Sequence, residues 1–313
     1  MLKNAKIYLA GHEGMVGSAL LDALKRSGFE NIITKSFYEL DLRDQGKVQE
    51  YIKSERPEYV FLIAGKVGGI HANIQFPAEY LYDNLMIAAN VMEASRISKV
   101  KKLLFLGSSC IYPRESEQPM KEDYLLTGSL EPTNEGYAIG KIAGLKMCQY
   151  YNKQYECNFL AAIPPNLYGP GDNFSDDHSH VISALIKKIH NAHKHNMNEV
   201  LMWGTGSARR EFMFTEDLTD GLIFLMEHPI ESPYINIGTG SDVSILELAE
   251  MIKDIIGYRG KFIWDANKPD GMPKKLMDSS KINAMGWKSR TTLLEGLKKT
   301  YLWYAGNIGV TEK

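Results

Sequence analysis

The sequence has few cysteines. Only Cys110, Cys148 and Cys157 occur among its 313 residues, and no two of them form a C-x-x-C pair. An odd number without a paired motif excludes a disulfide framework and argues against a zinc site. Because free thiols are typical of a reducing compartment, we expect a cytoplasmic protein.

Long hydrophobic runs are also missing from the chain. No stretch of about 18 consecutive apolar residues exists, so we expect no membrane span and no membrane partner. The first residues reach charge and glycine too early for a secretory signal peptide. A net charge of −2 lacks the basic bias of a nucleic-acid-binding domain, so a nucleic-acid partner is not expected either.

The chain does have the composition and the alternating pattern of a folded α/β protein. Apolar residues make up 44% and charged residues 24%, which is typical of globular domains. The first half alternates short apolar runs with stretches of helical periodicity. This pattern predicts a doubly wound, Rossmann-type parallel sheet covered by helices on both faces. The predicted elements are strands at Lys6–Ala10, Asn31–Thr34, Tyr59–Ala64, Lys102–Gly107 and Phe159–Ile163, and a first helix at Met15–Ser27.

The pattern changes after about residue 170, which predicts a smaller C-terminal α/β lobe that binds the substrate. We expect the dinucleotide-binding domain at 1–170 with returning segments at about 208–240, the lobe at 171–207 and 241–304, and a tail at 305–313. The predicted later elements are helices at His180–Lys188 and Ile245–Ile256, strands at Val200–Trp203 and Tyr234–Ile237, and a turn-rich loop at 269–273.

A glycine-rich turn joins the first predicted strand to the first predicted helix. Gly11, Gly14 and Gly17 stand there. Glycines at this point let the backbone approach a pyrophosphate, and the helix N-terminus offers free N–H groups to it. The spacing alone is a weak signal, and a tight turn without a ligand would also explain it. The strand–turn–helix context favours a dinucleotide.

The end of the second predicted strand bears on the choice of cofactor. A carboxylate near this point usually binds the ribose 2′-hydroxyl of NAD, but no acid occurs before Glu39. Lys35 would pair with a 2′-phosphate, whereas Glu13 in the glycine turn would repel one. NADP is therefore the predicted cofactor, with NAD as the alternative.

A tyrosine and a lysine stand at the spacing that a carbonyl reductase needs. Tyr137 and Lys141 are four residues apart, so they share one face of a helix. A lysine ammonium close to the phenol favours the phenolate and lowers the pKa of the tyrosine. Ser108 or Ser109, at the end of a predicted strand, would hydrogen-bond the same carbonyl oxygen. With the glycine turn, these residues predict hydride transfer to a carbonyl group.

Several longer motifs resemble those of the extended short-chain dehydrogenase/reductases, and among them the enzymes that act on GDP-4-keto-6-deoxy sugars. The resemblance runs from about Lys6 to Tyr304. The motifs are AGHEGMVGSA (10–19), KVGGI-A-N (66–73), LLFLGSSCIYP (103–113), EPTNE-YAI-KIAG (131–144), NLYGP-DNF (166–174), SHVI-AL (179–185), WG-G (203–206) and KPDG-P-KL-D (268–278).

The resemblance implies two reactions at one site, inversion of C3 and C5 of a GDP-4-keto-6-deoxy sugar and then reduction of C4 by NADPH. Cys110 matches the epimerisation base and His180 the acid, while Ser108, Tyr137 and Lys141 match the reductase triad. From the residues alone, the more common interpretations are a small buried apolar side chain for Cys110 and a histidine at a helix start for His180. One alternative is a C4 reductase of another GDP-4-keto sugar, such as a heptose, without epimerisation. Another is a non-catalytic dinucleotide-binding regulator.

The resemblance also implies a homodimer packed through long helices. No metal is expected, because no open three-ligand constellation with a carboxylate or thiolate is evident in the sequence. His190, His193 and His195 are interpreted as solvated surface. The family usually has arginine where Glu13 and Phe37 stand. The expected cofactor contacts are Gly11, Glu13, Gly14, Met15, Val16, Gly17, Lys35, Asp41, Leu42, Ala64, Gly65, Leu106, Gly107, Tyr137, Lys141, Pro164, Asn166, Leu167 and His180. The expected substrate contacts are Ser108, Ser109, Asn166, Lys188, Trp203, Arg210, Asp270 and Lys275.

Overall fold

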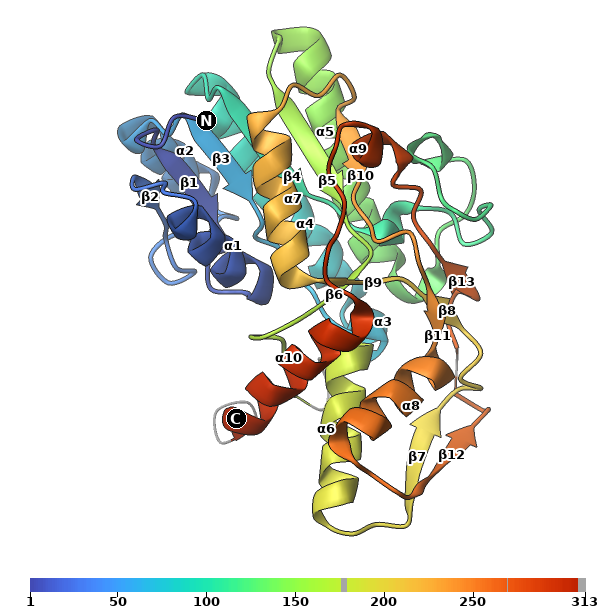
Figure 1. Cartoon of the computed structure of the whole chain (residues 1–313). Helices are drawn as coiled ribbons and strands as arrows, with labels where there is room; N and C mark the ends of the chain where they lie inside the picture. The colour runs from blue at the N-terminus through green and yellow to red at the C-terminus, as the bar shows by residue number, and fades with distance from the viewer. Residues whose placement is uncertain (176–178, 269, 309–313) are drawn as a thin grey trace.

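A computed structural model describes residues 1–175, 179–268 and 270–308. Its centre is a six-stranded parallel sheet in the order β10-β5-β4-β3-β1-β2, which confirms the predicted doubly wound fold (Figure 1). The strand order reverses between β1 and β3, and such a switch point opens a crevice for ligands. The strands are β1 (Ile7–Ala10), β2 (Ile32–Ile33), β3 (Tyr59–Leu62), β4 (Lys102–Leu106), β5 (Phe159–Ile163) and β10 (Tyr234–Asn236).

Helices cover both faces of this sheet, which is why its strands are continuous apolar runs. On one face α1 (Met15–Arg26) packs against α7 (Thr215–Glu227) over one hydrophobic cluster. On the other face α4 (Pro77–Ile97) lies between α2 (Gln45–Glu55) and α5 (Glu135–Tyr155) over a second cluster. The helix with Tyr137 and Lys141 thus packs against both α4 and strand β5 of the sheet.

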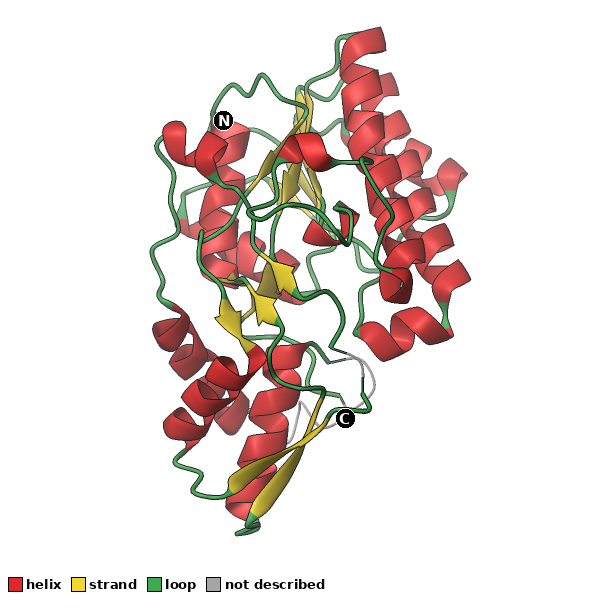
Figure 2. Cartoon of the chain, turned by 90° about the vertical axis from the view of Figure 1, so that its right-hand side faces the viewer, coloured by secondary structure: helices red, strands yellow, loops and turns green. Residues whose placement is uncertain are grey.

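A smaller lobe with its own hydrophobic cluster lies beyond the ends of the strands. It is built from α6 (Val181–Lys194), α8 (Ile245–Ile256) and α10 (Leu293–Gly306), with a parallel ribbon of β7 (Glu199–Trp203) and β12 (Lys261–Asp265). Figure 2 shows the ribbon at the lower end of the molecule, away from the larger sheet.

Short strands connect the lobe to the sheet. One small sheet has β8 between β11 and β13, and another pairs β6 with β9. In the first, Lys275 stands in register beside Arg210. These elements are β6 (Asn166–Tyr168), β8 (Arg209–Arg210), β9 (Phe212–Phe214), β11 (Val243–Ser244) and β13 (Lys274–Lys275), and the remaining short helices are α3 (Ile70–Gln75), η1 (Ser109–Ile111), η2 (Glu122–Tyr124), η3 (Pro132–Asn134) and α9 (Ser280–Ala284).

Four helices differ in how their N-termini are capped. α8 and α10 begin with capping boxes, in which Ser244 or Thr292 and the glutamate three residues later satisfy the first backbone groups. Gly14 and His180 stand directly before α1 and α6, and neither residue caps its helix with a side chain. The uncapped N–H groups of α1 and α6 are thus available to a ligand.

The structure departs from the expected division at its late segments. Ile282 and Trp287 pack into the core beneath α1 and α7, and Met277 packs into the core on the other face, although 241–304 was expected in the lobe. Helix α10 continues to Gly306, beyond the expected start of the tail. Position 269 of the expected loop and positions 309–313 of the tail lie outside the described residues. Within the described ranges, no helix is long and apolar enough to cross a membrane.

Candidate active site

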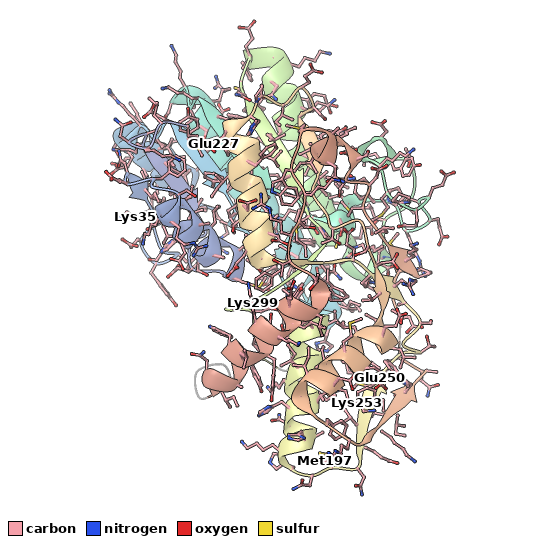
Figure 3. All side chains as sticks on the ribbon, viewed as in Figure 1. Lys35, Met197, Glu227, Glu250, Lys253 and Lys299 are labelled. Atoms are coloured by element: carbon pink, nitrogen blue, oxygen red, sulfur yellow. The ribbon has the colours of Figure 1, made fainter. Side chains whose placement is uncertain are left out.

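A single large cavity of about 1670 Å³ brings the expected site residues together. It runs from Lys35, beside the sheet edge, to Met197 at the far end of the lobe, and Figure 3 shows how far apart these two residues lie. All the expected contacts line it except Ser109. That serine is only 3% exposed, and its backbone N–H donates to the Pro164 carbonyl at 3.0 Å, so the expectation for Ser109 is corrected.

The glycine turn has the close backbone approach that a pyrophosphate site requires. A Cβ at Gly17 would lie 1.9 Å from the Gly11 carbonyl oxygen, and Gly11 itself has a φ of +94°. Gly14 precedes the uncapped first turn of α1, whose N–H groups face the cavity with Met15 and Val16. This cradle fits the pyrophosphate of a nicotinamide dinucleotide.

The far end of this part of the cavity is crowded with paired charges. Lys35 Nζ lies 2.9 Å from a carboxylate oxygen of Glu39. Arg43, which was not among the predicted site residues, donates to Asp41 at 2.7 Å and to Asp83 at 3.0 Å. The D-x-R spacing of Asp41 and Arg43 was the available signal. Every cation named here has a carboxylate partner, so a 2′-phosphate must compete with those partners.

Lys141 lies buried beneath Tyr137 on α5. Its Nζ donates to the Leu106 carbonyl at 3.0 Å and stands 5.8 Å from the centroid of the Tyr137 ring. The side chain has no carboxylate partner in the described part of the chain, and burial lowers the pKa of Lys141 to about 8. The ammonium is therefore held close to the phenol without a direct hydrogen bond to it.

The phenol of Tyr137 does not show the lowered pKa that the sequence predicts. Burial raises the pKa of Tyr137, the charge of Cys110 raises it further, and hydrogen bonding with Ser108 only partly offsets both. Lys141 does not lower the pKa of Tyr137 as predicted, because it directs its ammonium to the Leu106 carbonyl. Tyr137 is thus a protonated group that is ready to donate.

Side-chain donors from Asn134 and Lys275 lie close to the Cys110 sulfur. Asn134 Nδ2 lies 3.2 Å and Lys275 Nζ 3.3 Å from Sγ. Burial opposes ionisation, but the charge of Lys275 and the hydrogen bonds from Ser108, Lys275 and Asn134 outweigh it and lower the pKa of the Cys110 thiol. Asn134, one helical turn before Tyr137, was not predicted as a site residue.

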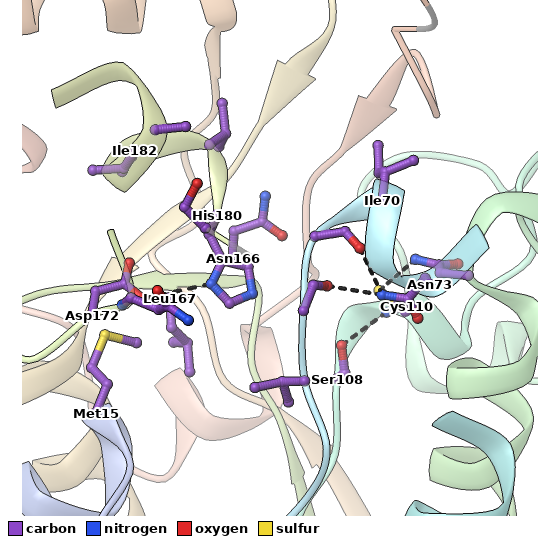
Figure 4. Close-up of a pocket in the computed structure, with 18 of the residues that line it drawn as sticks. Met15, Ile70, Asn73, Ser108, Cys110, Asn166, Leu167, Asp172, His180 and Ile182 are labelled. Atoms are coloured by element: carbon purple, nitrogen blue, oxygen red, sulfur yellow. Dashed lines mark hydrogen bonds and ion pairs between the residues drawn. The ribbon is translucent and has the colours of Figure 1, made fainter. Parts of the chain in front are cut away.

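His180 faces Cys110 from the opposite side of the cavity (Figure 4). It occupies the position before α6, and its Nδ1 lies 3.6 Å from Asp172 Oδ1. This carboxylate is buried and also accepts a hydrogen bond from the Ser183 hydroxyl. The interaction with Asp172 outweighs the effect of burial and raises the pKa of His180. An acid and a thiol therefore face one another across the same space.

Two of the expected substrate residues, Arg210 and Asp270, are held in place by hydrogen bonds. Arg210 donates through Nη2 to the Asp270 carbonyl at 3.1 Å. The Asp270 carboxylate accepts from the N–H and the hydroxyl of Thr205, each at 2.8 Å. Asp270 thus holds Thr205 in place beside the cavity. The Arg210 guanidinium has further donors that remain available to a ligand.

The remaining expected substrate residues lie along the lobe side of the cavity. Lys188 donates to the Leu201 carbonyl at 2.9 Å, and burial lowers the pKa of its ammonium. Trp203 is 59% exposed, with the ammonium of Lys268 5.3 Å from its ring centroid. An open aromatic face beside cations suits a nucleotide diphosphate or its base.

Comparison with known proteins agrees with this geometry. Residues 7–238 match the sequence profile of the NAD dependent epimerase/dehydratase family. The chain belongs to this family. It is 52% identical over 307 residues to "Probable GDP-L-fucose synthase 1" of Oryza sativa subsp. japonica, covering 98% of this chain and 94% of the relative.

Two further known proteins are similar to this chain over nearly their whole length. The GDP-L-fucose synthase of Escherichia coli strain K12 is 44% identical over 316 residues, with 98% of both chains covered. The solved structure of a GDP-mannoheptose C4 reductase from Campylobacter jejuni with NADP bound has a TM-score of 0.90 and 39% identity. It covers 97% of this chain and 99% of that one.

Proposed function

We propose that this protein is an NADPH-dependent GDP-L-fucose synthase, which epimerises GDP-4-keto-6-deoxymannose at C3 and C5 and then reduces C4. The observation that carries the proposal is one cavity lined by two sets of groups, Ser108, Tyr137 and Lys141 for reduction and Cys110 with His180 for proton exchange at carbon. The similarity to GDP-L-fucose synthases over nearly the full chain supports this reading.

The first domain holds the cofactor in this proposal. NADPH, when bound, supplies the hydride that reduces C4. The Gly11–Gly17 turn and the N-terminus of α1 bind its pyrophosphate. Lys35 is the cation proposed for the 2′-phosphate. Its ion pair with Glu39 must break before it can bind that phosphate. The NADP in the Campylobacter neighbour supports the cofactor assignment.

Three residues complete the reduction at the sugar ketone. Tyr137 donates its phenolic proton to O4 as negative charge develops there, which its high pKa permits. Ser108 donates a hydrogen bond to the same oxygen. Lys141, protonated below a pH of about 8, stabilises the phenolate that remains.

Epimerisation uses the ketone before it is reduced. The C4 carbonyl makes the protons on C3 and C5 acidic, because the electron pair left at carbon is delocalised onto O4. The Cys110 thiolate removes such a proton, and Tyr137 and Ser108 hydrogen-bond the enolate oxygen. His180, whose pKa the interaction with Asp172 raises, returns a proton from the opposite face and so inverts the carbon.

The lobe binds the GDP portion in this proposal. Lys188 and Arg210 supply positive charge for the diphosphate, and the open face of Trp203 packs against the ligand. These side chains come from α6, β7 and β8, so the lobe and the first domain both contribute to one substrate.

Product identity tests the proposal. The enzyme is incubated with NADPH and either GDP-4-keto-6-deoxymannose or a GDP-4-keto-6-deoxyheptose, and the products are identified by NMR. GDP-L-fucose from the first substrate is the expected result. The second candidate, a C4 reductase without epimerisation, is favoured by the similarity to the GDP-mannoheptose C4 reductase. A product with unchanged C3 and C5 would support that candidate.

We also infer a cytoplasmic homodimer that packs through α4 and α5. Free Cys110, Cys148 and Cys157 support the compartment. On α4 and α5, Tyr82 and Tyr150 are each more than half exposed, which supports a contact surface there. Light scattering on the purified protein measures the assembly, and a monomeric mass would contradict it.

A further inference from the structure

The sulfur of Cys110 is approached by donors from two distant parts of the chain. Asn134 belongs to η3, directly before α5, and Lys275 belongs to β13, 165 positions after Cys110. A free cysteine usually packs as a small apolar group. Two polar contacts at 3.2 and 3.3 Å show instead a sulfur that is held as a hydrogen-bond acceptor.

The backbone around Lys275 fixes the position of its ammonium. The Lys275 carbonyl accepts the N–H of Glu211 at 3.1 Å, and Lys275 stands in register with Arg210 across the two strands. The preceding residue, Lys274, directs its ammonium elsewhere and lies 3.2 Å from Asp242. Only the second of the two consecutive lysines therefore reaches the cavity, because side chains alternate along a strand.

We propose that Lys275, assisted by Asn134, is a positioning residue for epimerisation, which holds the Cys110 sulfur ionised and fixed, and that Lys275 is not a ligand of the diphosphate. This inference rests on the proposed function. It assigns to Lys275 a different role from the substrate contact that the family resemblance implied. The observation behind it is that the Lys275 ammonium is already committed to Sγ.

Charges around the sulfur are arranged to favour this role. Lys275 and Arg210 both supply positive charge that interacts with a thiolate at Cys110, and burial keeps that interaction strong. Tyr137 and His180 also lie within its electrostatic reach, and a thiolate makes both of them harder to deprotonate. One ionised sulfur thus favours the protonated forms of both proton donors in the cavity.

The proton balance of the step follows. A C–H bond of the substrate breaks, an S–H bond forms on Cys110, and the electron pair passes into the enolate at C4. The Lys275 ammonium stays protonated throughout and hydrogen-bonds the sulfur before and after the transfer. Reduction at C4 uses Tyr137 and no sulfur. Loss of Lys275 must therefore harm epimerisation far more than hydride transfer.

Alkylation of the thiol tests the inference without any substrate. The rate of Cys110 alkylation by iodoacetamide is measured against pH by peptide mapping, which separates it from Cys148 and Cys157. Lys275→Met is expected to raise the midpoint of the pH profile and to slow alkylation at pH 7 by about ten-fold. Lys275→Arg restores most of the rate. Lys274→Met, the matched control, leaves the midpoint unchanged.

A catalytic comparison provides the second readout. Deuterium exchange at C3 and C5 reports epimerisation, and oxidation of GDP-L-fucose at C4 with NADP⁺ reports hydride transfer alone. Lys275→Met is expected to lose about ten-fold more in exchange than in oxidation. Asn134→Ala is expected to show the same pattern with a smaller loss, because an amide has no net charge.

The outcomes separate this inference from the proposed function. An unchanged alkylation midpoint in Lys275→Met would overturn the inference, and so would equal losses in exchange and oxidation with a raised KM, which is the signature of a diphosphate ligand. If the midpoint rises but the wild-type enzyme incorporates no deuterium, the proposed function fails while the coupling of Lys275 to Cys110 stands.

Discussion

Two lysines approach two proton-transfer groups in the same cavity, and the outcomes are opposite. Lys275 touches the Cys110 sulfur at 3.3 Å, and the pKa of the thiol is lowered. Lys141 stands 5.8 Å from the ring centroid of Tyr137 and bonds the Leu106 carbonyl, and burial raises the pKa of the phenol. In buried surroundings, direct contact decides whether a cation offsets the cost of desolvation.

The difference suits the two reactions. Epimerisation starts with removal of a proton from carbon, so its base must be ionised before substrate arrives. Reduction ends with delivery of a proton to oxygen, so its acid must still hold that proton. Substitutions on one side of the cavity should therefore affect epimerisation and reduction to different degrees.

The largest effect is expected at Tyr137. Tyr137→Phe removes the proton donor at O4, and we expect C4 reduction to fall about 10³-fold. Deuterium exchange at C3 and C5 should fall much less, because Cys110 and His180 are intact. NADPH oxidation and mass spectrometry of the sugar measure the two rates. Equal losses in both would show that the two sides are not separable.

Replacement of Cys110 is the reciprocal experiment. A serine hydroxyl does not ionise near neutral pH, so Cys110→Ser is expected to reduce deuterium exchange about 10²-fold. Oxidation of GDP-L-fucose at C4 should decline far less. Cys148→Ser, at a buried position away from the cavity, serves as the control for thiol removal. Undiminished exchange in Cys110→Ser would remove the sulfur from the mechanism.

The pH dependence of C4 reduction tests the role of Lys141. Lys141 is protonated below its pKa of about 8 and neutral above it, so stabilisation of the phenolate is present below that pH and lost as the pH rises. We expect C4 reduction to fall about ten-fold between pH 7 and pH 9. A rate that stays flat across this range contradicts the assignment of Lys141.

The smallest effect is expected at Asp172. This carboxylate raises the pKa of His180, so Asp172→Asn lowers it, and the protonated imidazole is lost at a lower pH. We expect the alkaline limb of the exchange profile to move down by up to about one pH unit, with a loss of about three-fold at pH 7. C4 oxidation should keep its own profile, and a shift in both would point to a structural change.

Local patterns were enough to predict the framework of the fold. β5 and α8 have the bounds that the sequence predicts, because an apolar run and a helical periodicity are properties of neighbouring residues. The i,i+4 spacing likewise sufficed to place Tyr137 and Lys141 together on α5. The longer motifs, through the family resemblance, identified Cys110 and His180.

Contacts between distant segments were not predictable in this way. β13 has two residues and no periodic signal, yet its pairing with β8 is what brings Lys275 to Cys110. Ser109 was placed in the cavity because it follows Ser108, but η1 turns its side chain into the core. The raised pKa of Tyr137 depends on burial, which spacing along a helix does not reveal.

The most direct test of this account is isotope incorporation by the wild-type enzyme. GDP-4-keto-6-deoxymannose is converted with NADPH in deuterated water, and the position of each deuterium in the product is read by NMR. We expect GDP-L-fucose with deuterium on carbon at both C3 and C5, from solvent exchange through Cys110 and His180, and none at C4. A C4-reduced product without deuterium at C3 and C5 would contradict it.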